Sequence, residues 1–227
     1  DTQMEDIFNY TIDSIKKLSY ARYRPLTYLK KITPKLGSQI VGQFNMSGFM
    51  KSLLIKRLES SFYAFKKTLF RFLSSYEKFI EMMELGTVYI SKDIDIYDLM
   101  DNEDDDKLDH LIEEELVRSF KSTMFKDDFI NDLNNDLNIF KDLYTKWLGV
   151  EQDPKKDKFL EVLREDEVLR DGRIIIFTES KETAEYLGEY LNQEYKGEVL
   201  VYTGSSPTSR REIIEANFNP DYPAHKE

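Results

Sequence analysis

The stretch RIIIFTESKETAEYLGEYLNQEYKGEVLVYTGSSPTSRREIIEANF, residues 173–218, decides the fold class. An apolar run at 174–177 meets polar residues at 178–180, the first elbow, and an amphipathic segment follows. A second β-rich run at 199–202 ends in Thr-Gly-Ser-Ser at 203–206, the second elbow. Strand, helix and strand within about thirty residues predict a crossover unit with parallel strands, because antiparallel neighbours need no such connection. Ligands of parallel sheets bind at the carboxyl ends of the strands, so we expect function at the two elbows.

Three segments resemble a known family. IIIFTESKETAEYL, residues 174–187, resembles the opening strand and helix of the second RecA-like lobe of superfamily-two helicases. VYTGSSPTSRREIIEANFN, residues 201–219, is similar to the next part of that lobe, where a strand, a Gly, a small polar loop, an Arg and a closing Phe-Asn recur. SLLIKRLESSFYAFKKTL, residues 52–69, resembles the helical insertion between the lobes of bacterial Swi/Snf-type helicases. The occurrence of RLESS and FTES in this order and at this distance makes the resemblance more specific.

The resemblance implies a parent protein that is an ATP-dependent DNA helicase or translocase, with ATP and magnesium bound between two lobes. The first RecA-like lobe of the same parent chain is then a partner. This sequence contains no G-x-x-x-x-G-K-[ST] phosphate loop and no Asp-Glu-x-His cluster for magnesium. It begins at Asp1 and stops soon after residues 218–223, before the Arg-bearing helix of such a lobe. We therefore expect a fragment of a larger protein, with no catalytic residue and no cofactor of its own and no ATPase activity.

The resemblance also implies nucleic-acid contacts at both elbows. Ser180 is suited to hold a phosphate backbone, and it is equally suited to be a plain N-cap, which leaves other N–H groups available. Gly204 permits close backbone approach. Ser206 before Pro207 predicts a helix start, with a competing capping box at 209–212. Along the two elbows, the expected nucleic-acid contacts are Thr178, Ser180, Gly204, Ser205 and Arg210, and an ordinary surface role for Arg210 remains the alternative.

Charge is unevenly distributed along the chain, whose net charge is −11. Residues 16–78 contain 14 Lys/Arg and two acids, a net charge of +12, whereas residues 79–151 contain seven Lys/Arg and 20 acids, a net charge of −13. The two stretches either neutralise each other across packed helices or leave the basic one to bind phosphates. On the basic stretch, Lys56, Arg57 and Lys67 are candidate nucleic-acid contacts, and a solvated face or an acidic partner helix are the alternatives for Arg57.

Helical periodicity dominates the first 150 residues. We expect a helix at 4–31, a loop at 33–48 rich in Gly, Pro and Ser, and one long helix from Phe49 to Glu84. The long helix carries a heptad seam, Phe62, Phe65, Leu69, Phe72, Tyr76, Phe79 and Met83, and Gly86 ends it. Further helices are expected at 108–120 and at 130–148 with Gly149 as a stop, and Trp147 is expected in the core. A short helix at 158–169 leads into the α/β part.

Other classes of site are poorly supported. The acidic run 101–106 lacks the Gly and Glu spacing of a calcium loop, so we expect a solvated segment and no metal site. The two histidines, His110 and His225, lie far apart in the sequence, which argues against a His-ligated metal or a catalytic triad. No cysteine occurs and no long apolar run or signal peptide is evident, so we expect a cytoplasmic protein without membrane contact.

The expected fold is α/β overall and helix-rich. Residues 1–150 form a helical insertion domain with long antiparallel helices, and residues 154–227 form an incomplete RecA-like parallel α/β unit. The function expected for the fragment is weak, sequence-independent DNA contact as part of a helicase or translocase. A helical protein-interaction module with an α/β platform is the alternative, and a small-molecule enzyme would need a Gly-rich first elbow, which FTESKET lacks. The open edge of an apolar strand at 174–176 also predicts self-association, and poor order is expected after Asn219.

Overall fold

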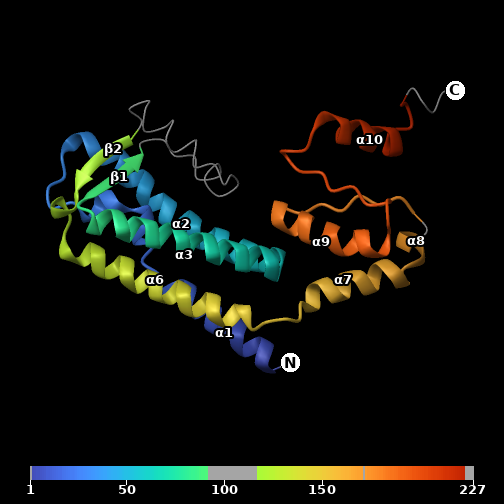
Figure 1. Cartoon of the computed structure of the whole chain (residues 1–227), viewed down its shortest axis with the longest axis horizontal. Coiled ribbons are helices and arrows are strands. Elements are labelled where there is room, and N and C mark those ends of the chain that lie inside the picture. The colour runs from blue at the N-terminus through green and yellow to red at the C-terminus, as the bar shows by residue number, and fades with distance from the viewer. Residues whose placement is uncertain (1, 92–116, 171, 223–227) are drawn as a thin grey trace. The chain divides into compact units, whose positions relative to one another are not determined.

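The structure, a computed structural model, describes residues 2–91, 117–170 and 172–222. It contains two compact units (Figure 1). The first comprises Asp1–Lys56 and Thr68–Gly149, and the second comprises Arg57–Lys67 and Val150–Glu227. Residues 57–67, where two long helices meet, are called the α2–α3 corner below. The assignment of 1–150 to an insertion and of 154–227 to a second lobe stays a prediction.

The first unit is helical with one small sheet. Its elements are α1 (Thr2–Lys17), short 3-10 helices at Ala21–Tyr23, Pro25–Tyr28, Pro34–Leu36 and Ser122–Met124, most of α2 (Gly37–Ser60) and α3 (Phe62–Glu84), β1 (Thr87–Ser91), β2 (Val117–Lys121) and α6 (Asp127–Leu148). β1 and β2 pair antiparallel, with Val88 opposite Phe120. In the view of Figure 1, α6 extends along α3 and reaches α1 at its far end.

The core of the first unit lies along α3 and α6. The heptad seam of α3 is confirmed over most of its length in this unit, where four side chains are at most 1% exposed: Leu69, Phe72, Tyr76 and Phe79. Met83, the last residue of the predicted seam, is only partly buried. The four buried side chains face the aromatic rings of α6, with 4.9 Å between the ring centres of Phe72 and Phe140 and 5.7 Å between those of Phe79 and Phe129. Trp147 is fully buried as expected, and its Nε1 donates a hydrogen bond to Thr11 Oγ1 at 2.9 Å. α6 ends at Leu148 with Gly149 as C-cap, which confirms that stop.

A buried carboxylate holds the turn after α1. Asp136, 1% exposed, accepts hydrogen bonds from the backbone N–H groups of Ser19 at 2.7 Å and Ala21 at 2.9 Å, and from the Tyr76 hydroxyl at 2.9 Å. Burial raises the pKa of Asp136, and these three donors oppose the shift. The turn passes through Tyr20, whose φ of 53° is left-handed. The helix expected at 4–31 is therefore wrong beyond Lys17.

The loop expected at 33–48 is also wrong, because α2 begins at Gly37. Composition suggested a loop, but Pro34 comes before the helix, in a 3-10 turn, where it does no harm. Ser47 and Ser52 donate to the backbone carbonyls of Phe44 and Gly48, so their hydroxyls are satisfied within the helix. Each glycine inside a helix costs only about 1 kcal/mol relative to alanine, so the glycines of this stretch do not forbid a helix.

The single helix expected from Phe49 to Glu84 is broken at Ser61. α2 ends at Ser60 and α3 begins at Phe62. Ser61 Oγ accepts a hydrogen bond from the Ala64 backbone N–H at 3.0 Å, which is the geometry of a helix N-cap. The serine pair in RLESS therefore starts a new helix, although no Gly or Pro is present.

The region after α3 differs from the expected pattern too. Gly86 ends the helix as predicted, with a φ of +89°, but β1 follows it and had not been expected. Of the helix predicted at 108–120, residues 117–120 instead belong to β2. A strand fits there because Val117 and Phe120 are β-branched or aromatic and pair along β1. The remainder of that segment and the acidic run at 101–106 lie outside the described residues.

The second unit contains α7 (Pro154–Glu165), α8 (Glu167–Arg170), α9 (Lys181–Glu194) and α10 (Thr208–Phe218), besides the α2–α3 corner. The short helix expected at 158–169 begins earlier, because Asp153 Oδ1 accepts from the Lys156 N–H at 3.1 Å and caps α7. It is also divided at Asp166, where α7 has ended and before α8 begins. Residues after 222, where poor order was expected, lie outside the described ones.

The two strands predicted at 173–177 and 198–202 do not form. Both runs lack strand hydrogen bonds and are drawn as coil before and after α9 (Figure 1). Ile174, Ile175 and Ile176 are 39–50% exposed and Phe177 is 90% exposed. A parallel strand needs a neighbour for its backbone and cover on both faces, and the described residues supply neither here. The order extended run, helix, extended run remains, while the parallel sheet is a wrong prediction for the described residues.

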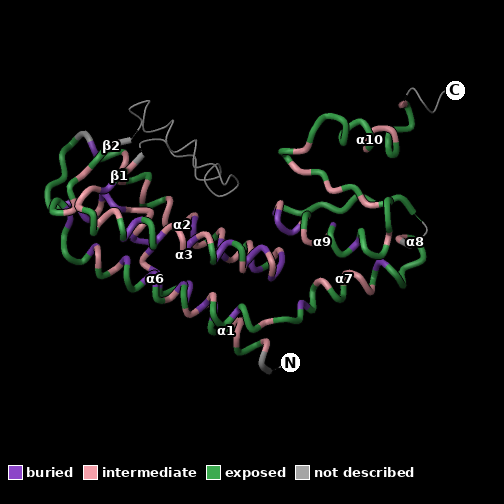
Figure 2. Tube along the Cα trace, in the orientation of Figure 1, coloured by how far each residue is buried: buried purple, intermediate pink, exposed green. Residues whose placement is uncertain are grey.

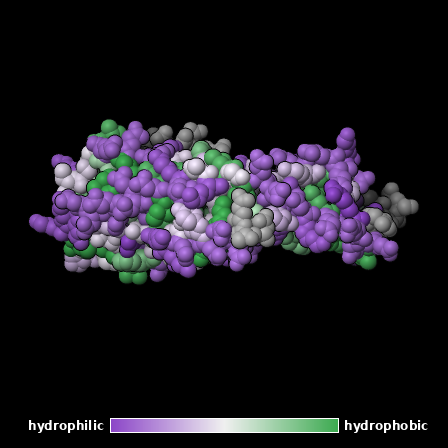
Figure 3. Space-filling view, turned by 90° about the horizontal axis from the view of Figure 1, so that it is seen from below, coloured by the Kyte–Doolittle hydropathy of each residue, from purple (hydrophilic) through white to green (hydrophobic). Residues whose placement is uncertain are grey.

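Surface polarity is high in both units. Most of the face seen in Figure 3 is hydrophilic, with scattered hydrophobic patches. Among the described residues, no helix combines the length and the apolar character needed to cross a membrane.

Candidate nucleic-acid interface

The first elbow is a buried helix start. Ser180 has extended backbone, and its Oγ accepts a hydrogen bond from the Thr183 N–H at 3.3 Å at the beginning of α9. Ser180 is 2% exposed, and Figure 2 shows the buried start of α9. The N-cap interpretation of Ser180 is therefore confirmed.

Glu182 occupies the position where we expected an external anion. Its Oε2 accepts from Ser180 Oγ at 3.0 Å and from Arg57 Nη1 at 2.9 Å. The side chains of Arg57 and Glu182 are 12% and 4% exposed. A carboxylate in the first turn of a helix is stabilised by the N–H groups there. Of the two alternatives kept for Arg57, a pairing with an acidic helix is thus the one observed.

Hydroxyl groups connect the α2–α3 corner to the first elbow. The Thr183 hydroxyl lies 2.8 Å from both Ser60 Oγ and Ser61 Oγ, and Ser60 Oγ lies 3.4 Å from the Thr178 hydroxyl. Thr183 and Ser61 are 4% and 5% exposed. These groups therefore exchange hydrogen bonds among themselves inside the unit.

Two lysines form further hydrogen bonds at the α2–α3 corner. Lys155 Nζ donates to the backbone carbonyls of Glu59 and Ser60, and Lys66 Nζ donates to that of Val150 at 2.6 Å. Burial lowers the pKa of Lys66, and the nearby carboxylates of Asp153 and Glu151 oppose that shift. The corner is consequently held by polar contacts to Val150, to the first turn of α7 and to the start of α9.

The second elbow is open to solvent. Its turn is closed by the Ser206 N–H, which donates to the Thr203 carbonyl at 3.0 Å, and by the Thr203 N–H, which donates to Ser206 Oγ at 2.9 Å. Gly204 and Ser205 are exposed, and a Cβ added at Gly204 would meet nothing within 4 Å. Ser206 therefore closes the turn and does not cap α10. The capping predictions at 206 and 209 are wrong, because α10 begins at Thr208 after Pro207 without a side-chain cap.

Arg210 lies beside this elbow on the first turn of α10. It is exposed, and its Nη1 donates to the Val201 carbonyl at 2.8 Å. The guanidinium carries further N–H donors that a phosphate can accept from. Arg211, the neighbour, forms an exposed pair with Glu215 at 3.0 Å.

The structure thus groups the predicted residues in two sets. Thr178, Ser180 and Arg57 lie together at the first elbow, and Gly204, Ser205 and Arg210 lie at the second. Lys67 lies in the second unit with its Nζ 5.3 Å from the ring centre of Tyr63, whereas Lys56 belongs to the first unit. Whether these residues bind nucleic acid stays a prediction.

Sequence reasoning missed Glu182 and Thr183 as partners of Arg57 and Ser60. A weak signal was present, because an acid placed two residues after a capping serine lies in the first turn of its helix. Glu185 of the same helix lies beyond the first turn and is exposed.

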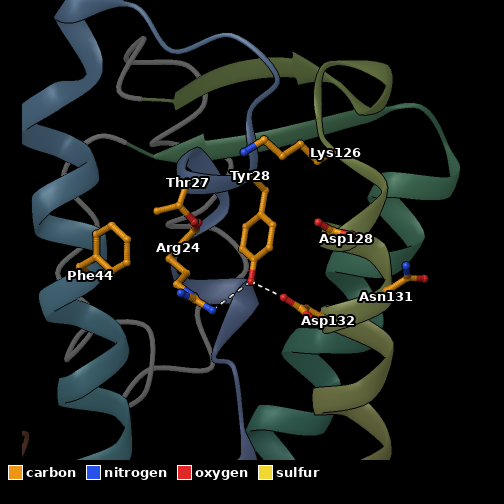
Figure 4. A pocket seen from close by; sticks show the side chains of 8 residues that line it. All are labelled: Arg24, Thr27, Tyr28, Phe44, Lys126, Asp128, Asn131 and Asp132. Carbon is orange, nitrogen blue, oxygen red and sulfur yellow. Dashed lines mark hydrogen bonds between the residues drawn. The ribbon is translucent and has the colours of Figure 1, made fainter.

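A separate pocket of about 480 Å³ lies in the first unit (Figure 4). Asp128, Asn131 and Asp132 line one side and Arg24 and Phe44 the other, with Tyr28 between them. The Tyr28 hydroxyl donates to Asp132 at 2.6 Å and accepts from Arg24 at 3.1 Å, and burial raises its pKa. The Tyr28 hydroxyl thus links Arg24 to Asp132, and none of the predicted site residues lines the pocket. Nor does any group of three or more acidic or histidine ligands suited to a metal occur in the described parts of the chain.

Comparison with known proteins gives one finding. Residues 154–225 match the family described as helicase conserved C-terminal domain. No curated protein and no solved structure matches the chain. The match covers both elbows, α9 and α10, and it supports the C-terminal lobe of a superfamily-two helicase for this part of the chain.

Proposed function

We propose that the chain contributes the beginning of the second RecA-like lobe of a Swi/Snf-type helicase or translocase, together with a helical insertion at residues 1–150. The match of residues 154–225 to the helicase C-terminal domain is the observation that carries this proposal. The succession of elbow, α9, elbow and α10 along the same residues supports it.

In this proposal the second elbow contacts the phosphate backbone of DNA. Gly204, Ser205 and Arg210 are all exposed within the segment 204–210, and the Gly204 backbone, the Ser205 hydroxyl and the Arg210 guanidinium offer hydrogen bonds to phosphate oxygens. Such contacts carry no base specificity, so binding is weak and independent of sequence. Lys67 adds a positive charge from the α2–α3 corner.

ATP and magnesium belong, in this proposal, to a site between this lobe and the first RecA-like lobe of the parent chain. When both lobes are present, they close on bound ATP and step along the phosphate backbone. The sequence contains no Walker-type phosphate loop, so the chain by itself neither holds nor hydrolyses ATP.

Fluorescence anisotropy with labelled DNA of two unrelated sequences tests the proposal. We expect equal, weak affinities whose logarithm falls linearly with the logarithm of salt concentration, because bound phosphates release counterions. ATP turnover, measured with and without DNA, should stay at background. A DNA affinity that does not change with salt concentration would contradict the proposal. ATP turnover that rises with the concentration of the purified chain would contradict it as well.

A further inference from the structure

Three tyrosines and two lysines form a column inside the second unit. Tyr63 of α3 and Tyr186 of α9 stack with 4.9 Å between ring centres and an interplanar angle of 4°. Tyr190 meets Tyr186 edge-on, with ring centres 5.1 Å apart. The ends of the column carry cations, since Lys67 Nζ lies 5.3 Å from the Tyr63 ring centre and Lys156 Nζ lies 4.3 Å from that of Tyr190. This set is called the tyrosine column below.

The residues of the tyrosine column come from three helices, α3, α7 and α9. Tyr63 and Lys67 are four residues apart on α3, and Tyr186 and Tyr190 are four residues apart on α9. Residues with this spacing lie on one face of a helix, so each helix presents a pair to the other. The polar contacts of the α2–α3 corner hold α3 against α9 at this level.

The two ends of the column reach solvent. Tyr190 is 38% exposed and Lys67 is exposed, while Tyr63 and Tyr186 are half-buried. Burial raises the pKa of the Tyr186 phenol and nearby carboxylates add to the shift, so this ring is uncharged at neutral pH. The column therefore presents uncharged aromatic rings beside the ammonium groups of Lys67 and Lys156.

From this geometry we infer that the tyrosine column stacks the bases of single-stranded nucleic acid, an inference that rests on the proposed function and adds a substrate class to it. Proteins that hold single strands combine aromatic rings, on which bases stack, with cations that contact phosphates. A base that replaces the Lys67 ammonium over Tyr63 extends the column by one ring. The displaced ammonium then pairs with the adjoining phosphate, and duplex DNA, whose bases are already stacked, gains nothing from this contact.

The column would otherwise be only a joint between α3 and α9. In that case its rings stabilise the fold. The charge of Lys156 is then balanced by Asp157, with which it pairs at 3.3 Å. The two accounts differ in one observable. If the column only connects α3 to α9, the affinity for a bound strand does not depend on whether the strand carries bases. If the column stacks bases, the strand with bases binds more tightly.

Anisotropy titrations with an oligothymidine and an abasic strand of the same length separate the accounts, because the two strands carry the same phosphates. We expect the whole chain to bind oligothymidine about 10-fold more tightly, which corresponds to one stacked base. Tyr63→Leu should remove this preference, and Tyr63→Phe, which keeps the ring, should retain it. Because Tyr63 is half-buried, the more exposed pair Tyr190→Leu and Tyr190→Phe repeats the test where folding is less at risk.

Each outcome decides the matter. Equal, salt-dependent affinity for both strands overturns the inference and leaves the proposed function standing. A preference that survives both leucine variants in folded protein also overturns the inference. Absence of salt-dependent binding to either strand overturns the proposed function and the inference with it.

Discussion

The two elbows of the second unit have similar sequences and opposite environments. At the first, Ser180 is buried and the side chain of Arg57 is 12% exposed, and both donate hydrogen bonds to the buried Glu182 carboxylate. At the second, Gly204 and Ser205 are exposed, and the hydroxyl of Ser206 closes its own turn. Both contain small polar residues between an extended run and a helix. The difference teaches that small polar residues stabilise the fold where they hydrogen-bond to a carboxylate of the same unit. Where no such carboxylate lies beside them, they remain accessible to a ligand.

The largest difference is expected for Arg57→Ala at the first elbow. This change leaves the Glu182 carboxylate buried without its cation, which costs about 3–5 kcal/mol of unfolding free energy. Hydrogen exchange of the α9 amides measures the loss in the second unit directly. Fluorescence of Trp147, the sole tryptophan of the sequence, reports on the first unit.

Two variants control this experiment. The exposed pair of Arg211 and Glu215 has the same charges, so Arg211→Ala should cost less than about 0.5 kcal/mol. Replacing both partners, Arg57→Leu with Glu182→Leu, should recover most of the lost stability, since no charge is then buried. A loss for Arg57→Ala no greater than that for Arg211→Ala would show that the pair at the first elbow does not form.

Two glycines give the next largest contrast. A Cβ at Gly188 of α9 would lie 2.2 Å from Val201 Cγ2, whereas a Cβ at Gly204 meets nothing within 4 Å. We expect Gly188→Ala to lower the free energy of unfolding by about 1–3 kcal/mol, as overpacking does. Gly204→Ala should be close to neutral in thermal denaturation followed by circular dichroism.

The double variant Gly188→Ala with Val201→Ala checks the cause. It removes the methyl group that clashes, so it should be more stable than Gly188→Ala alone. If the two variants have the same midpoint of thermal denaturation, α9 does not pack against residue 201 in the way described.

A smaller effect is expected at the two serines. Ser180→Ala removes the N-cap of α9 and should cost about 1 kcal/mol, whereas Ser205→Ala removes no helix contact and should leave stability unchanged. Urea denaturation with exchange of the α9 amides as the readout distinguishes the two. Equal stabilities would mean that the Ser180 hydroxyl contributes nothing to the helix.

Strong periodicity was predictable from the sequence. The seam of α3, the existence and C-terminal end of α6 and the burial of Trp147 follow from apolar side chains at helical spacing. The N-cap role of Ser180 was also predictable, because a serine before an amphipathic segment is typical of a helix start.

Features that depend on distant partners were not predictable. The break at Ser61 involves Thr183, the turn at Tyr20 involves Asp136, and Arg57 pairs with Glu182 from more than a hundred residues away. The strands at 173–177 and 198–202 failed for a related reason. Their composition favours extended backbone, but a strand also requires a neighbour to complete its hydrogen bonds.

The salt dependence of DNA binding by Arg210→Ala tests the central claim most directly, with Arg211→Ala as the matched control. The account predicts that Arg210→Ala weakens binding to every sequence and reduces the slope of log affinity against log salt by about one unit, because one phosphate contact is lost. Arg211→Ala, whose arginine pairs with Glu215, should change neither quantity by as much. An unchanged slope for Arg210→Ala, or an equal change in both variants, would contradict a phosphate contact at the second elbow.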